Sequence, residues 1–182
     1  MRVISIVGMA GSGKSEVAAV FEKKGYKKIR FGDITDAEIK KRGLKLNEDN
    51  ERLIRQELRE KHGMAAYAKL NQPKIDAALK SGNVVIDGLY SWEEYTLLKN
   101  RYGDNFHIVA VFASPATRYL RLATRQVRPL TTEEAAGRDV AELKNTNKGG
   151  PIAMADYTII NESTLKILEK ETGKVIAAIG KA

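Results

Sequence analysis

Residues Gly8–Ser15, which read GMAGSGKS, have the types and the spacing that hold a phosphate group. They match the pattern G-x-x-x-x-G-K-[ST], whose glycines let consecutive backbone N–H groups point at one anion. Lys14 supplies a mobile positive charge for β- and γ-phosphates, and Ser15 offers its hydroxyl to Mg²⁺. The alternative is a glycine-rich structural turn, but the complete pattern favours a nucleoside triphosphate site.

The loop also has the flanking elements that such a site requires. The apolar run Val3–Val7 precedes it, and the helix-forming stretch EVAAVFEKKG follows, with Gly25 as a natural stop. A helix that begins at the loop adds a dipole that favours an anion. We therefore expect the following residues to bind the nucleotide: Gly8, Ala10, Gly11, Ser12, Gly13, Lys14, Ser15 and Glu16.

Two aspartates follow apolar runs and are further candidates for chemistry. Asp87 ends the run in VVIDGLYS, where a carboxylate can orient Mg²⁺ or its waters. A helix cap or turn aspartate is the equal alternative. Asp33, in RFGDITDAE, can either cap the helix that begins at Ile34 or accept a proton from an acceptor hydroxyl.

Three arginines share one face of the amphipathic helix predicted for NERLIRQELREKHG: Arg52, Arg55 and Arg59. Their guanidinium groups can bind an acidic group of a substrate bidentately. Glutamates within the same stretch provide the alternative, in which the arginines form surface ion pairs of little energetic gain: Glu51, Glu57 and Glu60.

A second arginine run occupies SPATRYLRLATRQVRPL: Arg118, Arg121, Arg125 and Arg128, followed later by Arg138. No acidic residue lies nearby before Glu133, so we interpret the run as uncompensated charge that neutralises a transition state. A solvated helix face is the alternative. Asn161 ends the last apolar run and is predicted either to border the nucleotide base or to belong to a helix cap, as Ser163 or Thr164 would.

Five apolar runs alternate with helical stretches: Val3–Val7, Lys28–Phe31, Val84–Asp87, His107–Phe112 and Tyr157–Ile160. This alternation predicts an α/β fold with a parallel sheet buried on both faces. We expect one domain over residues 1–182, with two more polar segments, 33–63 and 125–150, that handle ligands.

Composition narrows the class of protein. The 182 residues are 43% hydrophobic and 30% charged, as is usual for a globular domain. The chain has no cysteine, which excludes disulfides and thiolate sites, and its two histidines, His62 and His107, are too isolated for a metal centre. No signal peptide or membrane-spanning run is visible, so we expect a cytoplasmic protein. The net charge of +8 is spread along the chain, which favours a cleft for small polyphosphates over a nucleic-acid partner.

With these motifs in place, the chain resembles the P-loop small-molecule kinases, specifically the dephospho-CoA kinase and nucleoside monophosphate kinase group. GMAGSGKSEVA resembles the nucleotide loop of the group, FGD at Phe31–Asp33 its acceptor motif, VVIDG its third strand, and RLATR its lid entry. The segments LTTEEAAGRD and ADYTIINESTL are closer to dephospho-CoA kinase. The resemblance covers nearly the whole chain.

The resemblance implies a P-loop NTPase fold with sheet order 2-3-1-4-5, a helical acceptor segment and a short lid. It also implies transfer of the γ-phosphoryl group of ATP, with Mg²⁺, to a small nucleotide-like acceptor. Arg121 would lie against the adenine. We expect the remaining roles to fall as follows: catalysis on Lys14, Asp33 and Arg125; the acceptor on Asp33, Arg55, Arg59, Asp87 and Gly88; the lid on Arg125, Arg128 and Arg138; the metal on Ser15 and Asp87; and the nucleotide also on Arg121 and Asn161.

Two positions depart from the pattern of the monophosphate kinases. Those enzymes carry arginines three residues after the aspartate of GD and shortly after DG, where this chain has Asp36 and Tyr90. The departures favour a dephospho-CoA-like hydroxyl acceptor, while a nucleoside monophosphate stays open as the alternative. The rival of another class is a regulatory NTPase, which would need switch segments and a glutamine or similar group that orients water.

Overall fold

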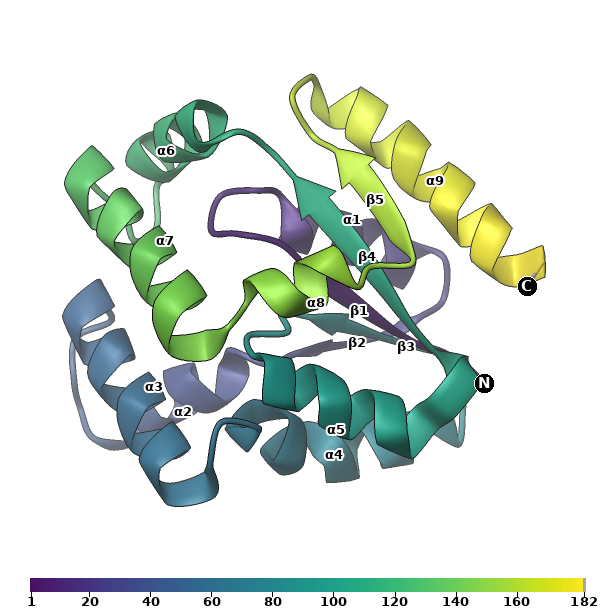
Figure 1. Cartoon of the computed structure of the whole chain (residues 1–182), viewed down its shortest axis with the longest axis horizontal. Helices are drawn as coiled ribbons and strands as arrows, with labels where there is room; N and C mark the ends of the chain where they lie inside the picture. Colours follow the sequence, from purple (N-terminus) through teal and green to yellow (C-terminus); the bar gives the residue numbers. More distant parts are fainter. Residues whose placement is uncertain (182) are drawn as a thin grey trace.

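Five parallel strands form one sheet in the computed structural model, which describes residues 1–181 (Figure 1). The strands are β1 (Val3–Val7), β2 (Lys27–Arg30), β3 (Val84–Asp87), β4 (Phe106–Phe112) and β5 (Tyr157–Ile160). Their order is β2-β3-β1-β4-β5, and every neighbouring pair is parallel. The predicted topology is therefore confirmed, and the predicted strand bounds differ by one residue only, at β2 and β4.

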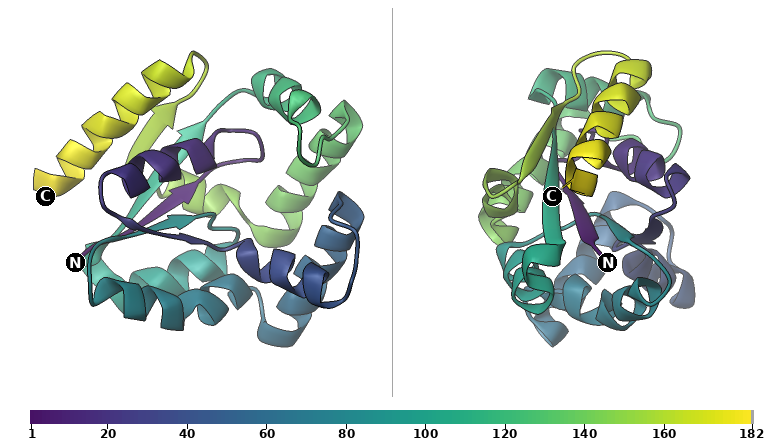
Figure 2. Two further views of the ribbon diagram at one scale, coloured as in Figure 1. Left: turned by 180° about the vertical axis from the view of Figure 1, so that it is seen from behind. Right: turned by 90° about the vertical axis from the view of Figure 1, so that its right-hand side faces the viewer.

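Helices cover both faces of this sheet. Their bounds are α1 (Lys14–Lys23), α2 (Asp33–Lys41), α3 (Glu48–His62), α4 (Ala66–Leu79), α5 (Trp92–Tyr102), α6 (Pro115–Thr124), α7 (Thr132–Thr146), α8 (Gly149–Ala153) and α9 (Leu165–Lys181). One face packs on α1 and α9, and the other on α4, α5 and α8 (Figure 2). A short 3₁₀ turn, Gly103–Asn105, leads from α5 into β4.

The core does not bury every strand equally. All residues of β1 and β3 are buried, as their continuous apolar sequence predicts. The expectation of burial on both faces is wrong for β2 and β5. They are the edge strands, and Lys27 and Lys28 of β2 and Ile160 of β5 are exposed.

Helices rise beyond the carboxyl ends of the strands at two places. The pair α2–α3 lies within the predicted acceptor segment 33–63, and α7 lies within the predicted lid segment 125–150. The helices α3 and α7 lie side by side at this end of the molecule in both views (Figures 1 and 2). Ligand sites in such sheets lie outside the carboxyl ends of the strands, so this is where a site belongs. Over residues 1–181, no helix is both long enough and apolar enough to cross a membrane.

Candidate functional site

The loop between β1 and α1 is shaped by glycines and held by one amide. Gly13 has a φ of 99°, and a Cβ atom there would lie 2.3 Å from the Nδ2 atom of Asn161. That Nδ2 atom donates a hydrogen bond of 2.9 Å to the carbonyl of Ser12. At Gly8, a Cβ atom would lie 2.4 Å from the carbonyl oxygen of Val111. The loop therefore needs glycine at both positions, and Asn161 braces the loop instead of lining the site.

A cavity of about 820 Å³ opens between this loop, α3, α6 and α7. The predicted site residues that line it are Ala10, Gly11, Gly13, Lys14, Ser15, Glu16, Arg55, Arg59, Asp87, Arg121, Arg125, Arg128 and Arg138. The predicted residues that are not on its wall are Gly8, Ser12, Asp33, Gly88 and Asn161. One cavity thus brings together groups that the sequence places in four separate motifs.

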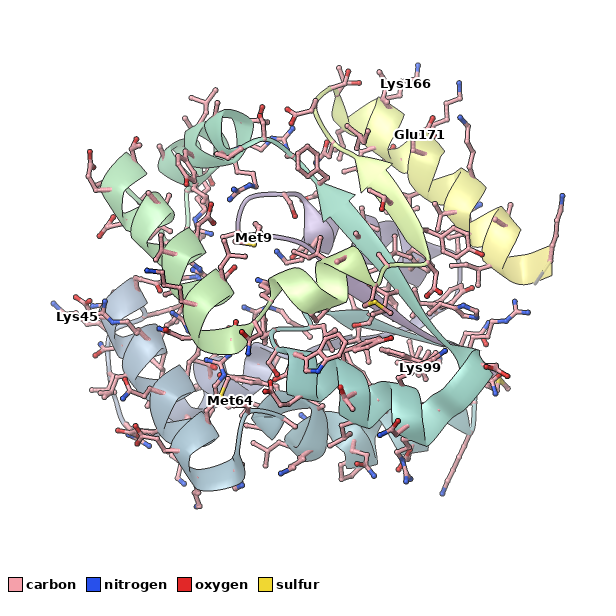
Figure 3. All side chains as sticks on the ribbon, in the orientation of Figure 1. Met9, Lys45, Met64, Lys99, Lys166 and Glu171 are labelled. Carbon is pink, nitrogen blue, oxygen red and sulfur yellow. The ribbon has the colours of Figure 1, made fainter. Side chains whose placement is uncertain are left out.

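Two lysines, Lys14 and Lys148, line this cavity. The Lys14 ammonium donates a 2.9 Å hydrogen bond to the carbonyl of Met9, on the part of the loop that faces α6 and α7 (Figure 3). Burial lowers the pKa of Lys14 to about 7, and repulsion by Lys148 adds to this effect. Lys148 donates a 2.7 Å hydrogen bond to Glu142. Burial works against the charge of Glu142, but Lys148, Arg138 and Lys14 together lower its pKa to about 2.

Ser15 and Asp87 have the chemistry of a magnesium site. Ser15 lies in the first turn of α1, and Asp87 ends β3; both line the cavity. In residues 1–181 no cluster of three or more histidine or acidic side chains could hold a metal alone. Mg²⁺ is usually held by one or two protein groups together with waters and substrate phosphates, so a hydroxyl and one carboxylate beside a phosphate loop fit it.

The arginine run is not uncompensated, as its sequence suggests. Arg118 is buried and binds Asp139 of α7 through two hydrogen bonds of 2.9 and 2.6 Å. It also donates a 3.1 Å hydrogen bond to the carbonyl of Ala10 in the phosphate loop. The carboxylate that neutralises Arg118 lies 21 residues away in the chain, so no local sequence pattern predicts this pair. The expectation is therefore wrong for Arg118, which ties α6 and α7 to the loop.

We expect Asp139→Asn to lower the free energy of unfolding by about 3–5 kcal/mol, because it leaves the Arg118 charge buried and unpaired. Urea unfolding followed by circular dichroism measures the change. The matched control is Asp49→Asn, which removes an exposed partner of Arg52 and should have no measurable effect. Equal losses in the two variants would contradict the structural role given to Asp139.

Ion pairs join α3 to the lid side of the cavity. Glu51 accepts hydrogen bonds from Arg128 and Arg55, and Glu48 accepts from Arg55 and, at 2.8 Å, from Arg138. We call the Glu51–Arg128 and Glu48–Arg138 contacts the arm–lid ion pairs, because they join α3, the arm, to the predicted lid segment 125–150. They show that Arg128 and Arg138 are also neutralised. Within residues 1–181, the cations on the cavity wall that have no carboxylate partner are Lys14, Arg59, Arg121 and Arg125.

The end of the cavity next to the predicted acceptor segment 33–63, which we call the acceptor end, is built around Arg30. Its guanidinium donates hydrogen bonds of 2.8 Å to Asp33 and 2.6 Å to Asp36. The Asp33 side chain is 60% exposed and lies off the cavity wall, whereas Asp36 lines the cavity. Capping by Asp33 is also wrong, since Gly32 is the N-cap of α2 and no side chain caps it. Arg30 therefore holds both aspartates, and of the two only Asp36 lies on the cavity wall.

Several residues on the cavity wall were missed by the sequence analysis: Arg30, Glu48, Glu142 and Lys148. Glu142 lies four residues after Arg138 and bonds to it at 3.2 Å, so helical i,i+4 spacing carried a usable signal. Lys148 lies in NTNKGG, a turn-like stretch where a lysine is ordinarily solvated. No local pattern marks it as buried.

A family model described as an AAA domain matches residues 4–142. The chain is 38% identical over 181 residues to a UPF0200 protein of Thermococcus kodakarensis, with 97% of each chain covered. A UPF0200 protein of Thermococcus gammatolerans is 37% identical over 181 residues, covering 97% of this chain and 95% of its own.

Two solved structures share the fold. A gluconokinase from Sinorhizobium meliloti superposes with a TM-score of 0.63 at 16% identity, covering 99% of this chain and 94% of its own. A shikimate kinase from Bacteroides thetaiotaomicron gives 0.62 at 15% identity, covering 97% and 98%. At these identities the likeness concerns the fold, which is that of the P-loop NTPases.

Proposed function

The chain belongs to the AAA domain family and to the UPF0200 proteins, and from this we propose that it is an ATP- and Mg²⁺-dependent phosphotransferase. Its acceptor is a hydroxyl group of a small nucleotide-like molecule, as in dephospho-CoA kinases. The named activities of the two structural neighbours, a gluconokinase and a shikimate kinase, support a kinase.

The distribution of free and paired cations carries this proposal. Beside the phosphate loop, Lys14, Arg121 and Arg125 have no carboxylate partner within residues 1–181, so they are available to a triphosphate. At the acceptor end, Arg30 and Arg55 are already held by carboxylates. A monophosphate acceptor would need free arginines to offset the repulsion between two anions. A charge-balanced acceptor end instead suits a neutral hydroxyl.

Arg59 is the exception at the acceptor end. Its guanidinium lies 5.5 Å from the ring centroid of Tyr67, and its Nε atom is buried without a hydrogen-bond partner. A single unpaired arginine suits an anionic group on the acceptor away from the reacting hydroxyl. This is why we propose a nucleotide-like acceptor and not a neutral sugar.

In the proposed reaction, the residues that line the cavity bind the phosphates, the metal ion and the transferring phosphoryl group. Lys14 and the loop amides hold the β- and γ-phosphates, and Ser15 and Asp87 are the protein's ligands for Mg²⁺. The metal ion, when bound, neutralises charge on the β- and γ-oxygens. Arg125 contacts the transferring phosphoryl group, and Arg121 lies beside the nucleotide. The arm–lid ion pairs hold α3 against α7, which keeps water from the reacting atoms.

We propose that Asp36, which lines the cavity while Asp33 does not, orients the acceptor hydroxyl. We expect Asp36→Asn to lower kcat by about 10²-fold, because proton acceptance by a placed carboxylate contributes at least that much. Asp33→Asn removes the other partner of Arg30 from outside the cavity and should lower kcat less. Steady-state kinetics with thermal unfolding of both variants makes the comparison. A larger loss in Asp33→Asn would return the role to Asp33.

A phosphoryl-transfer screen tests the function itself. Purified protein, ATP and Mg²⁺ are incubated with dephospho-CoA, with nucleoside monophosphates and with their deoxy forms, and product masses are measured. We expect a product phosphorylated on a hydroxyl. Brisk phosphorylation of AMP or CMP would instead identify a nucleoside monophosphate kinase. ATP turnover that no acceptor stimulates would favour a regulatory NTPase.

A further inference from the structure

One buried cation in the cavity has no part in the roles given above. Lys148 follows α7 and is 1% exposed, although lysine is rarely buried so fully. Its ammonium has a single side-chain partner, Glu142, at 2.7 Å, and it lies 5.5 Å from the ring centroid of Tyr90. It lines the same cavity as Lys14.

The backbone around Lys148 fixes its position. Asn147 ends α7 in the left-handed conformation, with φ 51° and ψ 37°, and the Lys148 amide donates to the carbonyl of Glu142 at 3.2 Å. Gly150 packs so closely on the ring of Trp92 that a Cβ atom would lie 2.7 Å from it. The turn from α7 into α8 is therefore anchored, and it aims the lysine inward instead of letting it reach solvent.

Pairing with Glu142 does not account for this lysine. The same carboxylate also accepts a 3.2 Å hydrogen bond from Arg138, and its charge acts on Lys14. Arg138 has a second carboxylate partner, Glu48, whereas Lys148 and Lys14 depend on the charge of Glu142. Asp87 is the other acidic group near Lys14, and in the proposed function its carboxylate is a ligand for Mg²⁺. Buried like charges repel strongly, so the cluster leaves positive charge that an anion would compensate.

The two lysines approach the cavity from different elements. Lys14 comes from the phosphate loop at the start of α1, and Lys148 comes from the turn between α7 and α8, which leads back to the sheet (Figure 1). We propose that Lys148 contacts the terminal phosphoryl group of the bound triphosphate, on the side away from the loop. Glu142 holds the ammonium in place before the nucleotide arrives. This inference rests on the triphosphate binding of the proposed function, but not on the acceptor.

Binding of ATP and ADP separates a γ-phosphate contact from a structural lysine. Calorimetric titration with each nucleotide and Mg²⁺ gives the ratio of the two dissociation constants. We expect Lys148→Met to weaken ATP binding by about 10–100-fold, which is what a charge-assisted hydrogen bond contributes, and to leave ADP binding nearly unchanged. Thermal unfolding without nucleotide is measured on the same samples.

The matched control is Lys144→Met, which removes the same charge from an exposed site on the last turn of α7. It should change neither dissociation constant. If Lys148→Met does not fold, Lys148→Arg is used instead, because it keeps the charge with a different shape. We expect its ratio of the ADP to the ATP dissociation constant to fall below that of the wild type, but by less than the loss of the charge would cause.

Two results would overturn the inference: equal weakening of ATP and ADP binding, or an unchanged ratio in the folded variants. A wild-type protein that binds both nucleotides equally would also overturn it. The proposed function fails separately, if the wild-type protein prefers ATP over ADP but phosphorylates no acceptor. In that case the assignment of Lys148 stands.

Discussion

Replacing Arg125 by alanine is expected to lower kcat by about 10³–10⁵-fold, the contribution of an arginine that stabilises a transferring phosphoryl group. Arg125 follows the last residue of α6, lines the cavity and has no carboxylate partner within residues 1–181. Its Nε–H donates to the carbonyl of Arg128, which leaves the two terminal nitrogens for a ligand. Arg125 contacts negative charge that develops on the phosphoryl group only during transfer. The affinity for ATP in the ground state should therefore change far less than kcat.

Arg125→Lys separates geometry from charge. A lysine keeps the positive charge but lacks the planar fork and the Nε–H that the Arg128 carbonyl fixes, so its kcat should also be low. Arg101→Ala is the charge control, because Arg101 is exposed on α5 and pairs with Asp76 away from the cavity. Steady-state kcat and the ATP dissociation constant are measured for all three. Wild-type kcat in both Arg125 variants would show that the arginine is only surface charge.

The fold could be predicted because its signals are local. Each strand is a short apolar run with a polar boundary, and the phosphate loop is a contiguous motif between a strand and a helix. The sheet order came from the resemblance to a kinase group and is confirmed. The edge strands departed, and so did Phe112 at the end of β4, because burial depends on which elements cover a strand and not on the strand's own sequence.

The charge state of the site could not be predicted in the same way. Whether an arginine is free depends on carboxylates that the fold brings from distant segments. Arg138 is neutralised by Glu48, 90 residues away, and Arg128 by Glu51, 77 residues away. The sequence shows each of these residues on its own helix or loop but contains no local pattern that pairs them.

The arm–lid ion pairs have a consequence for substrate access. Glu51 is only 4% exposed, and its contact with Arg128 joins α3 to the segment between α6 and α7. Arg128 itself has a φ of 57°, a conformation uncommon for a residue other than glycine. If the proposed function holds, we expect α3 and α7 to separate when a large substrate enters and the ion pairs to re-form on closure. Opening of this kind is a common rate limit in enzymes with lids.

Replacing Lys14 by alanine should have the second large effect. Loss of a charge-assisted contact weakens ATP binding by about 1.5–3 kcal/mol, and loss of one preorganised cation lowers kcat by about 10²–10³-fold. The fold should keep its stability, because the ammonium makes one hydrogen bond, to Met9, and repels Lys148. Calorimetric ATP titration, turnover and thermal unfolding are compared with Lys24→Ala, which removes a lysine at the other end of α1. Unchanged ATP affinity and turnover in Lys14→Ala would show that the loop does not bind a nucleotide.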